Sequence, residues 1–403
     1  MIGLTSARRR IAGAAAIAGA LLGLGLLGGG TPAAANDVAT MTLSGWDFEP
    51  SDYPQCRIST TAQTIRGMAG RIKANSPVSY LADGNAADED APLYRVPTAA
   101  ERTDFRAGLN ALIDDNSSVA TTRLTAAGFA VCSGEIDSTS PDPNVGFNMV
   151  LVYSPAGLNA STSLGAPMLV LWGARGQPDY TVLSGPHLTS EVNVFDQVLS
   201  ALDRKQYVRG AILSGTDRCN RLALAPAQFQ GDTTECGGDY RISDMAHNTG
   251  TIFQDMHDVL RGQYPQLYNV QLHGMSQAGI SVSRGTDPDG ADGTGTHPDD
   301  PVTVAHAYAE VQLKKELEIG GVNSTEQPHY DALSSCTAYV HSMTGVSALT
   351  RDLHCGTFNA QLARERDLNA QDRFIHIEQS RYIRDYHPVD YLIKVAYGLF
   401  SKT

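Results

Sequence analysis

Short apolar runs alternate with longer amphipathic stretches over the last two thirds of the chain, and this pattern constrains the fold most. Each apolar run is nearly continuous and ends at glycine, proline or a polar residue: "FNMVLVY", "PMLVLWG", "DYTVLSG", "RGAILSG", "NVQLHG" and "RFIHIE". The stretches between them space their apolar residues as helices do: "TSEVNVFDQVLSALDRK", "SDMAHNTGTIFQDMHDVLRGQ", "PVTVAHAYAEVQLKKELEI" and "HPVDYLIKVAYGLF". Strands that are apolar throughout are buried on both faces. The pattern therefore predicts an α/β fold with a mixed, mostly parallel sheet and helices on both faces.

The first 35 residues have the features of a signal peptide. Arg8, Arg9 and Arg10 precede a small-residue apolar run, and "AAA" at 33–35 offers a cleavage site before Asn36. The arginines leave open whether export follows the general or the twin-arginine route. No later segment is long and apolar enough to span a bilayer. We expect a secreted protein, extracellular or periplasmic, without a membrane partner.

Residues 36–142 predict a helical extension in front of the α/β domain. This part contains two stretches with helical periodicity, "STTAQTIRGMAGRIKAN" and "TAAERTDFRAGLNALIDD", and ends in the turn-forming "STSPDPN". The predicted organisation is a signal peptide over 1–35, an N-terminal extension over 36–142 and an α/β catalytic domain over 143–403.

Charge and cysteine content narrow the partners and the compartment. The formal net charge of −13 argues against nucleic acid and anionic lipid as partners, because both are negatively charged. Six cysteines, an even number, are expected to form disulfides in an oxidising compartment. We favour the pairs Cys219–Cys236 and Cys336–Cys355, each closing a loop worth roughly 3 kcal/mol in the chain-entropy model. Their spacings match no cysteine-based zinc site.

Polar residues that follow the apolar runs are the candidates for chemistry, because ligands bind beyond the carboxyl ends of the strands in such sheets. The candidates are His187 and Glu191, then Arg218, Asn220 and Arg221, then His273, and finally His376 and Glu378. Two histidines and one carboxylate are a ligand set that catalytic Zn²⁺ takes while keeping one position for water. We expect His187, Glu191 and His273 to bind zinc and Glu378 to act as general base. The arginines could hold a substrate carboxylate in bidentate fashion.

The order "PH…E", "LHG" and "IE.SR" resembles the zinc-carboxypeptidase superfamily, and within it the N-formylglutamate amidohydrolase and poly-γ-glutamate hydrolase branch. The resemblance covers roughly residue 147 to the end at the level of motifs. It implies a zinc-carboxypeptidase-like fold and the same four roles for His187, Glu191, His273 and Glu378. It also implies that His247, on the helix before the "LHG" strand, faces the substrate. Two departures stand out. Three residues separate His187 from Glu191, where the carboxypeptidases have two, and Gly274 follows His273, where the formylglutamate enzymes have serine.

These residues predict a secreted zinc-dependent hydrolase that cleaves an amide bond, in a peptide or an acyl amino acid, next to a carboxylate. Metal-activated water and Glu378 would perform the reaction on a small-molecule or peptide substrate.

Two alternatives stay open. The first is a serine esterase with Ser276 in the elbow-like "GMSQAG" and a triad completed by Asp352 with His354 or His387. Such an elbow needs a helix directly after the serine, whereas "GISVSRGTDPDGADGTGT" predicts a short strand and a long loop. The second is a non-catalytic binding protein on the same fold.

Overall fold

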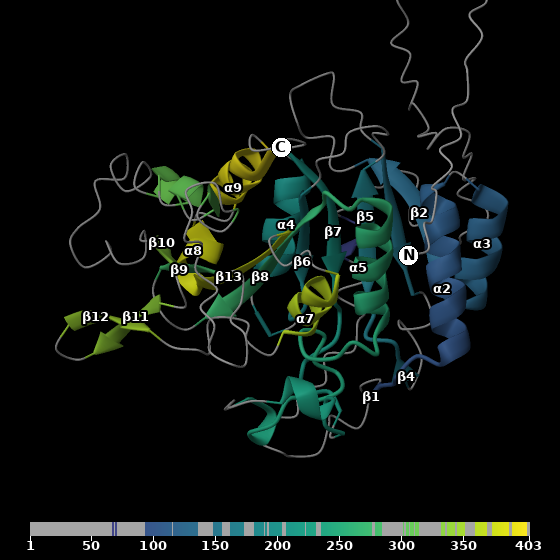
Figure 1. Cartoon of the computed structure of the whole chain (residues 1–403), viewed down its shortest axis with the longest axis horizontal. Coiled ribbons are helices and arrows are strands. Elements are labelled where there is room, and N and C mark those ends of the chain that lie inside the picture. Colours follow the sequence, from purple (N-terminus) through teal and green to yellow (C-terminus); the bar gives the residue numbers. More distant parts are fainter. Residues whose placement is uncertain are drawn as a thin grey trace, which may run out of the picture. The chain divides into compact units, whose positions relative to one another are not determined.

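Figure 1 shows the computed structural model of the protein, which describes part of the chain. The described residues are 67, 69–70, 93–114, 116–135, 148–154, 162–172, 181–188, 190–191, 193–203, 207–221, 223–230, 235–275, 279–283, 301, 304–305, 307–309, 311–313, 332–334, 337–342, 345–350, 359–368, 373–386 and 389–400.

A nine-stranded mixed sheet has the strand order β10-β9-β13-β8-β6-β7-β5-β3-β2. Its strands are β2 (Ala130–Glu135), β3 (Asn148–Tyr153), β5 (Met168–Trp172), β6 (Thr181–Gly185), β7 (Val208–Leu213), β8 (Tyr268–Met275), β9 (Ile280–Ser283), β10 (Ala332–Ser334) and β13 (Phe374–Ser380). The four central strands β13, β8, β6 and β7 run parallel, and antiparallel pairs flank them on both sides. The six apolar runs named above correspond to β3, β5, β6, β7, β8 and β13. The predicted mixed α/β sheet is confirmed.

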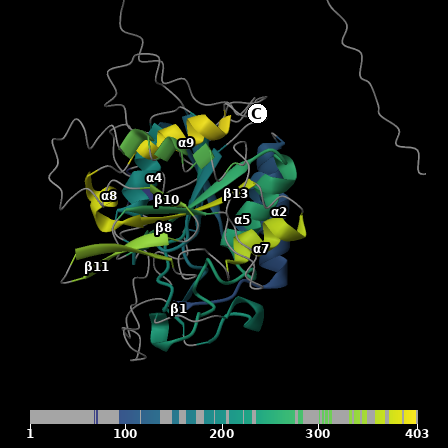
Figure 2. The same cartoon turned by 60° about the vertical axis from the view of Figure 1, so that its left-hand side comes forward.

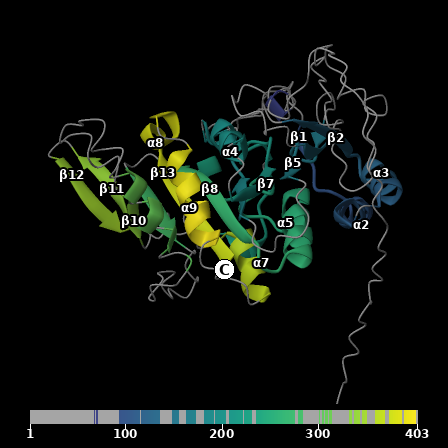
Figure 3. The ribbon, with the colours of Figure 1, turned by 90° about the horizontal axis from the view of Figure 1, so that it is seen from above.

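Helices lie on both sides of the sheet. Those with assigned bounds are α2 (Ala99–Ile113), α3 (Ser117–Ala126), α4 (Val194–Asp203), α5 (Ile252–Gln263), α7 (Ala360–Asp367), α8 (Arg381–Tyr386) and α9 (Asp390–Phe400). Figure 3 shows α4 and α5 on opposite sides of β7, and Figure 2 shows α7 beside α5. Every described residue of β6 and β13 is buried, as expected for strands covered on both faces.

The next strands after β6 are added first on one side of it and then on the other. From β6 it passes through α4 to β7 on one side, and from β7 through α5 to β8 on the other side of β6. Right-handed crossovers in opposite directions place the two helices on opposite faces. Open α/β sheets bind their ligands at such a change of direction, here beyond the carboxyl ends of β6 and β8.

Residues before 143 also contribute to this sheet. Strand β2 pairs with β3 along its whole length, and α2 packs against α5. Residues 39–403 form one compact unit. The division at residue 142 stays a prediction, and the signal peptide lies outside the described residues, as does most of the first predicted helix of the extension. Two small two-stranded sheets pair β1 (Leu93–Tyr94) with β4 (Thr162–Ser163) and β11 (Thr337–Ser342) with β12 (Gly345–Thr350).

The helix predicted over 243–263 begins nine residues later than expected, at Ile252. Local hydrogen bonds explain the delay. The Asn248 side chain accepts a hydrogen bond from the Gly250 N–H (2.8 Å), which forms a turn, and Thr251 caps the helix by accepting from the Gln254 N–H. His247 therefore lies in the turn before α5, and its predicted placement on the helix is wrong.

The structure supports one of the two favoured disulfides. Cys219 and Cys236 are bonded, as predicted, whereas Cys336 and Cys355 lie outside the described residues. A disulfide is typical of proteins in oxidising compartments, which agrees with the prediction of export. Among the helices of the described part, none has the length and hydropathy needed to cross a membrane.

Candidate metal centre and catalytic site

A single tight turn after β6 brings His187 and Glu191 together. The His187 carbonyl accepts hydrogen bonds from the N–H groups of Glu191 (2.8 Å) and Ser190 (3.1 Å). Residues four apart in a helical turn lie on the same side, so three intervening residues suit this geometry. The Nδ1 atom of His187 lies 2.9 Å from Oε1 of Glu191. Both side chains are almost completely buried.

His273 and Glu378 come from the neighbouring parallel strands β8 and β13. The strands pair in register, with Glu378 opposite His273 and His376 opposite Gln271. Residues opposite each other in adjacent strands point to the same face, so His273, His376 and Glu378 gather on one side of the sheet. His273 also meets the turn after β6, since its Nδ1 lies 3.4 Å from Glu191 Oε1 and its ring lies 4.9 Å from that of His187.

The predicted ligands His187, Glu191 and His273 form one compact group. Their ligand atoms all lie within 4.8 Å of one another, and all three residues are buried. The second carboxylate oxygen of Glu191, Oε2, is buried without a hydrogen-bond partner among the described residues. A buried carboxylate oxygen without a partner is costly unless a cation or a further donor satisfies it. Two imidazoles and one carboxylate are also a donor set that suits Zn²⁺, so the group fits such an ion.

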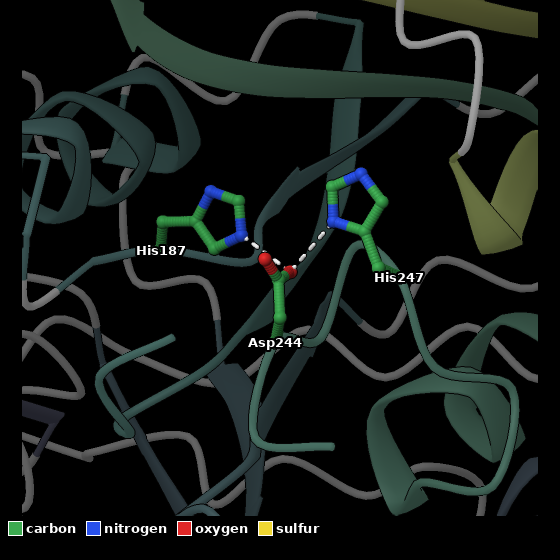
Figure 4. A group of neighbouring side chains, drawn as sticks. All are labelled: His187, Asp244 and His247. Carbon is green, nitrogen blue, oxygen red and sulfur yellow. Dashed lines mark hydrogen bonds and ion pairs between the residues drawn. The ribbon is translucent and has the colours of Figure 1, made fainter. Parts of the chain in front are cut away.

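The second nitrogen of each imidazole is held by a hydrogen-bond acceptor. His187 Nε2 lies 2.8 Å from Asp244 Oδ1, and His273 Nε2 lies 2.9 Å from Gln271 Oε1. Figure 4 shows Asp244 between the imidazoles of His187 and His247, and His247 Nδ1 lies 3.0 Å from the same oxygen. Acceptors of this kind fix the tautomer and ring orientation of metal-binding histidines. The Nδ1 atoms that face Glu191 are therefore the ones available to an ion.

We expect Asp244→Asn to weaken zinc binding by about 10- to 100-fold. The Asp244 carboxylate orients the His187 ring and makes it more basic, and asparagine lacks the charge that does so. The measurement is the zinc dissociation constant in competition with a chromophoric chelator. Asp258→Asn is the matched control, since Asp258 pairs with Arg106 and Arg364 away from the cluster. Equal zinc affinity in the wild type and Asp244→Asn would remove Asp244 from the site.

The surroundings of the group shift the pKa values of its two histidines in opposite directions. Burial favours the neutral imidazole, but the carboxylates of Asp244 and Glu191 outweigh it and raise the pKa of His187 to about 9. Burial lowers the pKa of His273, and the nearby Glu191 charge offsets this only in part. Burial would raise the pKa of Glu191, but His187 and His273 hold it well below its usual range. The metal-free group therefore carries its proton on His187 at neutral pH.

Zinc binding to the metal-free protein should release at least one proton per ion at pH 7, because zinc needs the unprotonated Nδ1 of His187. Since the pKa of His187 is raised to about 9, zinc affinity should increase with pH up to about 9. The released protons can be counted by calorimetry in buffers of different ionisation enthalpy. Binding without proton release at pH 7 would show that His187 is already neutral.

Glu378 has the environment of a carboxyl group adapted for proton transfer. It is buried, and desolvation together with the negative charge of Glu191 raises the pKa of Glu378 to about 8. A cation bound at Glu191 would favour the ionised form again. The two states then lie close in energy near neutral pH, which is the condition for general acid–base catalysis. His376 Nε2 lies 3.7 Å from Glu378 Oε1 on the same strand.

Two arginines approach the group. Ser243 holds the loop of Arg218 by donating to the Arg218 carbonyl (2.8 Å), and the Arg218 guanidinium lies 3.5 Å from Glu191 Oε1. Arg218 therefore lies beside the predicted ligands, and its role in substrate binding stays a prediction. The other arginine, Arg384, was not among the predicted site residues. A Cβ added to Gly274 would lie 2.7 Å from Cζ of Arg384, so the absent side chain at 274 leaves room for this guanidinium beside His273.

The other predicted substrate-binding residues do not converge on the group in the same way. Asn220 is fully buried, and its side-chain oxygen accepts a hydrogen bond from the Tyr94 N–H in β1. The backbone N–H of Arg221 donates a hydrogen bond to the Ser243 hydroxyl. Within the described residues, the Arg221 guanidinium has no contact with the cluster. His247 stacks on Tyr240, with ring centroids 3.5 Å apart, and reaches the cluster through Asp244. Substrate binding by Asn220, Arg221 and His247 stays a prediction.

The serine alternative rests mainly on residues outside the described ones. Ser276, Asp352, His354 and His387 all lie there, so no triad geometry is known. Strand β9 begins at Ile280, as the sequence predicted for the stretch after the serine. A nucleophile elbow instead continues directly into a helix. The described residues after the serine, 279–283, therefore do not form the helix that the serine alternative requires.

Comparisons with known proteins give no family assignment. No family model matches the sequence, and no curated protein matches it. Two solved structures are similar. N-formylglutamate amidohydrolase from Ralstonia eutropha JMP134 has 13% identity and a TM-score of 0.28, over 59% of this chain and 95% of that chain. A candidate metallopeptidase from Shewanella amazonensis SB2B has 11% identity and a TM-score of 0.25, over 75% and 92%. TM-scores this low do not establish a common fold, so the family stays a prediction.

Proposed function

We propose that the chain is an exported zinc-dependent hydrolase that cleaves an amide bond next to a carboxylate in an acyl amino acid or peptide. The observation that carries this proposal is the convergence of His187, Glu191 and His273, whose ligand atoms lie within 4.8 Å of one another beside the buried Glu378. These side chains come from the turn after β6 and from β8 and β13, and they meet where the strand order of the sheet changes direction.

The protein side chains have distinct tasks in the proposed reaction. His187, Glu191 and His273 hold the ion, and when bound it supplies Lewis acidity that stabilises negative charge on the substrate carbonyl oxygen. Glu378 takes a proton from the attacking water and later returns it to the leaving amine. Asp244 and Gln271 keep the two imidazoles in their binding orientation.

The proposed preference for a carboxylate rests on Arg218. Its guanidinium lies beside Glu191, and the Arg218 side chain is 17% exposed, so we expect a substrate carboxylate to reach it. A planar guanidinium recognises a carboxylate through two parallel hydrogen bonds. Cleavage next to the carboxylate follows from the short distance between this guanidinium and the ion ligands.

The test is hydrolysis of a matched pair of substrates by the purified mature protein: an N-acyl amino acid with a free carboxylate and its carboxamide analogue. We expect hydrolysis of the carboxylate form, its loss on treatment with a chelator, and its recovery on addition of zinc. A protein that contains zinc but hydrolyses neither compound nor any peptide would be a binding protein, and the proposal of catalysis would be wrong. Labelling of Ser276 by a phosphonate ester with loss of activity would favour the serine hydrolase.

A further inference from the structure

We propose that Gln361 is a positioning residue of the metal centre: acting through Gln271, it fixes which nitrogen of His273 carries the proton. This inference rests on the proposed function, because His273 is one of the proposed zinc ligands. A neutral imidazole has a proton on one nitrogen and a lone pair on the other. Zinc needs the lone pair on Nδ1, the nitrogen that faces Glu191, so the proton has to be on Nε2.

The orientation of one buried amide decides the tautomer of His273. Nε2 of His273 lies 2.9 Å from Oε1 of Gln271, and an amide oxygen can only accept, so Nε2 carries the proton. If the Gln271 amide were turned over, its NH₂ group would donate to Nε2, and the proton would be on Nδ1. Oε1 of Glu191, 3.4 Å from Nδ1, would accept a hydrogen bond there. Since this second tautomer also has a partner, the Gln271 amide must be held in place.

Gln361 holds the Gln271 amide through a chain of hydrogen bonds with one direction. The Gln271 NH₂ group donates to Oε1 of Gln361 (2.9 Å). The Gln361 NH₂ group donates in turn to the Met245 carbonyl (2.8 Å) and to Oε1 of Gln254 (3.1 Å). A backbone carbonyl cannot donate, so Met245 fixes the orientation of Gln361, and Gln361 fixes that of Gln271.

Asn359 supports the same orientation from a second fixed point. The Leu362 N–H donates to Oδ1 of Asn359 (3.0 Å) at the start of α7, and a backbone N–H cannot accept. The Asn359 NH₂ group is therefore turned towards Gln271 and donates to its Oε1. Gln271, Asn359 and Gln361 are all buried, so the loss of a hydrogen-bond partner is costly to each of them. Both fixed points direct the Gln271 oxygen to His273.

The zinc dissociation constant, measured in competition with a chromophoric chelator, gives the first test. Gln361→Leu removes the acceptor of the Gln271 NH₂ group and should weaken zinc binding by about 10-fold, the lower end of the effect of outer partners of a metal ligand. Adding Gln271→Glu should restore the affinity, because a carboxylate accepts from His273 in either orientation. Gln197→Leu is the control, since it removes a buried amide on α4 that is bonded to Gln379 (2.8 Å), and it should keep wild-type affinity.

The tautomer of His273 gives a second test that needs no zinc. Nitrogen NMR chemical shifts of the ring distinguish the protonated nitrogen from the other one, at an alkaline pH where the ring is neutral. Nε2 should carry the proton in the zinc-free wild type, and Nδ1 should carry it in a measurable fraction of Gln361→Leu. Asn359→Asp should act in the same direction, because it keeps the cap of α7 but replaces the donor to Gln271 by an acceptor. Asn359→Asp preserves the side-chain shape and decides the question if Gln361→Leu does not fold.

Three results would each overturn the proposal. The first is wild-type zinc affinity in both Gln361→Leu and Asn359→Asp, and the second is a proton on Nε2 of His273 in every variant. The third is a loss of affinity in Gln361→Leu that Gln271→Glu does not restore, because a purely structural role of Gln361 gives that result. The proposed function fails separately, if the wild type binds no zinc or hydrolyses no substrate. The tautomer of the zinc-free protein decides the present inference in that case too.

Discussion

Replacing Glu378 with glutamine is expected to lower kcat by about 10²- to 10⁴-fold while leaving the zinc content unchanged. Glutamine keeps the shape of the side chain and its place on β13 but cannot accept a proton from water. The loss corresponds to about 3 to 5 kcal/mol of transition-state stabilisation. The measurement combines steady-state kinetics with metal analysis of the same preparation.

Glu365→Gln is the matched control for Glu378→Gln. Glu365 is also a buried glutamate, but it lies on α7 and pairs with Arg261 at 2.8 Å. Its replacement should lower the melting temperature and leave kcat of the folded protein unchanged. Full activity in Glu378→Gln would refute the assignment of Glu378 as the general base.

Removing either histidine of the ligand group is expected to cost the protein its metal. Structural zinc sites with four ligands bind with about 10 to 16 kcal/mol, so one ligand accounts for about 3 kcal/mol. His187→Ala and His273→Ala should each weaken zinc binding by about 100-fold or more. Hydrolysis should fall with zinc occupancy, and the measurement is the zinc content after dialysis against a buffered zinc concentration.

The control for the ligand variants is His257→Gln, which removes a buried histidine of α5 that is bonded to Asn269 outside the cluster. It should retain the zinc content of the wild type. Melting curves distinguish loss of a ligand from loss of the fold, because the zinc-free variants should still unfold cooperatively. Wild-type zinc stoichiometry in His187→Ala would exclude His187 as a ligand, and the same result for His273→Ala would exclude His273.

The sequence predicted the sheet and the proximity of the three candidate ligands because both depend on local patterns. Runs such as "VLSG" and "VQLHG" are long and apolar enough to identify β6 and β8, and the polar residues after them lie at the carboxyl ends of these strands. The convergence of His187 with His273 followed from this placement alone. The unusual spacing of His187 and Glu191 turned out to match a helical turn.

The supporting residues were not predictable in the same way, because their contacts are tertiary. Asp244 is three residues before His247 in a turn that helical periodicity obscures, and its contact with His187 spans 57 positions. Gln271 alternates with apolar residues on β8 and gives no signal of its hydrogen bond to His273. Arg384 reaches the site from α8, which follows β13 directly, and the absent side chain at Gly274 leaves room for it. The glycine after the second histidine was the one sequence signal for this contact.

The zinc content of the purified protein, measured by plasma mass spectrometry after dialysis against a low, buffered zinc concentration, tests the central claim most directly. The account predicts one zinc ion per chain in the wild type, and none in a variant that combines His187→Ala with His273→Ala. A wild-type protein that takes up no zinc, or one whose zinc survives this double replacement, would contradict it.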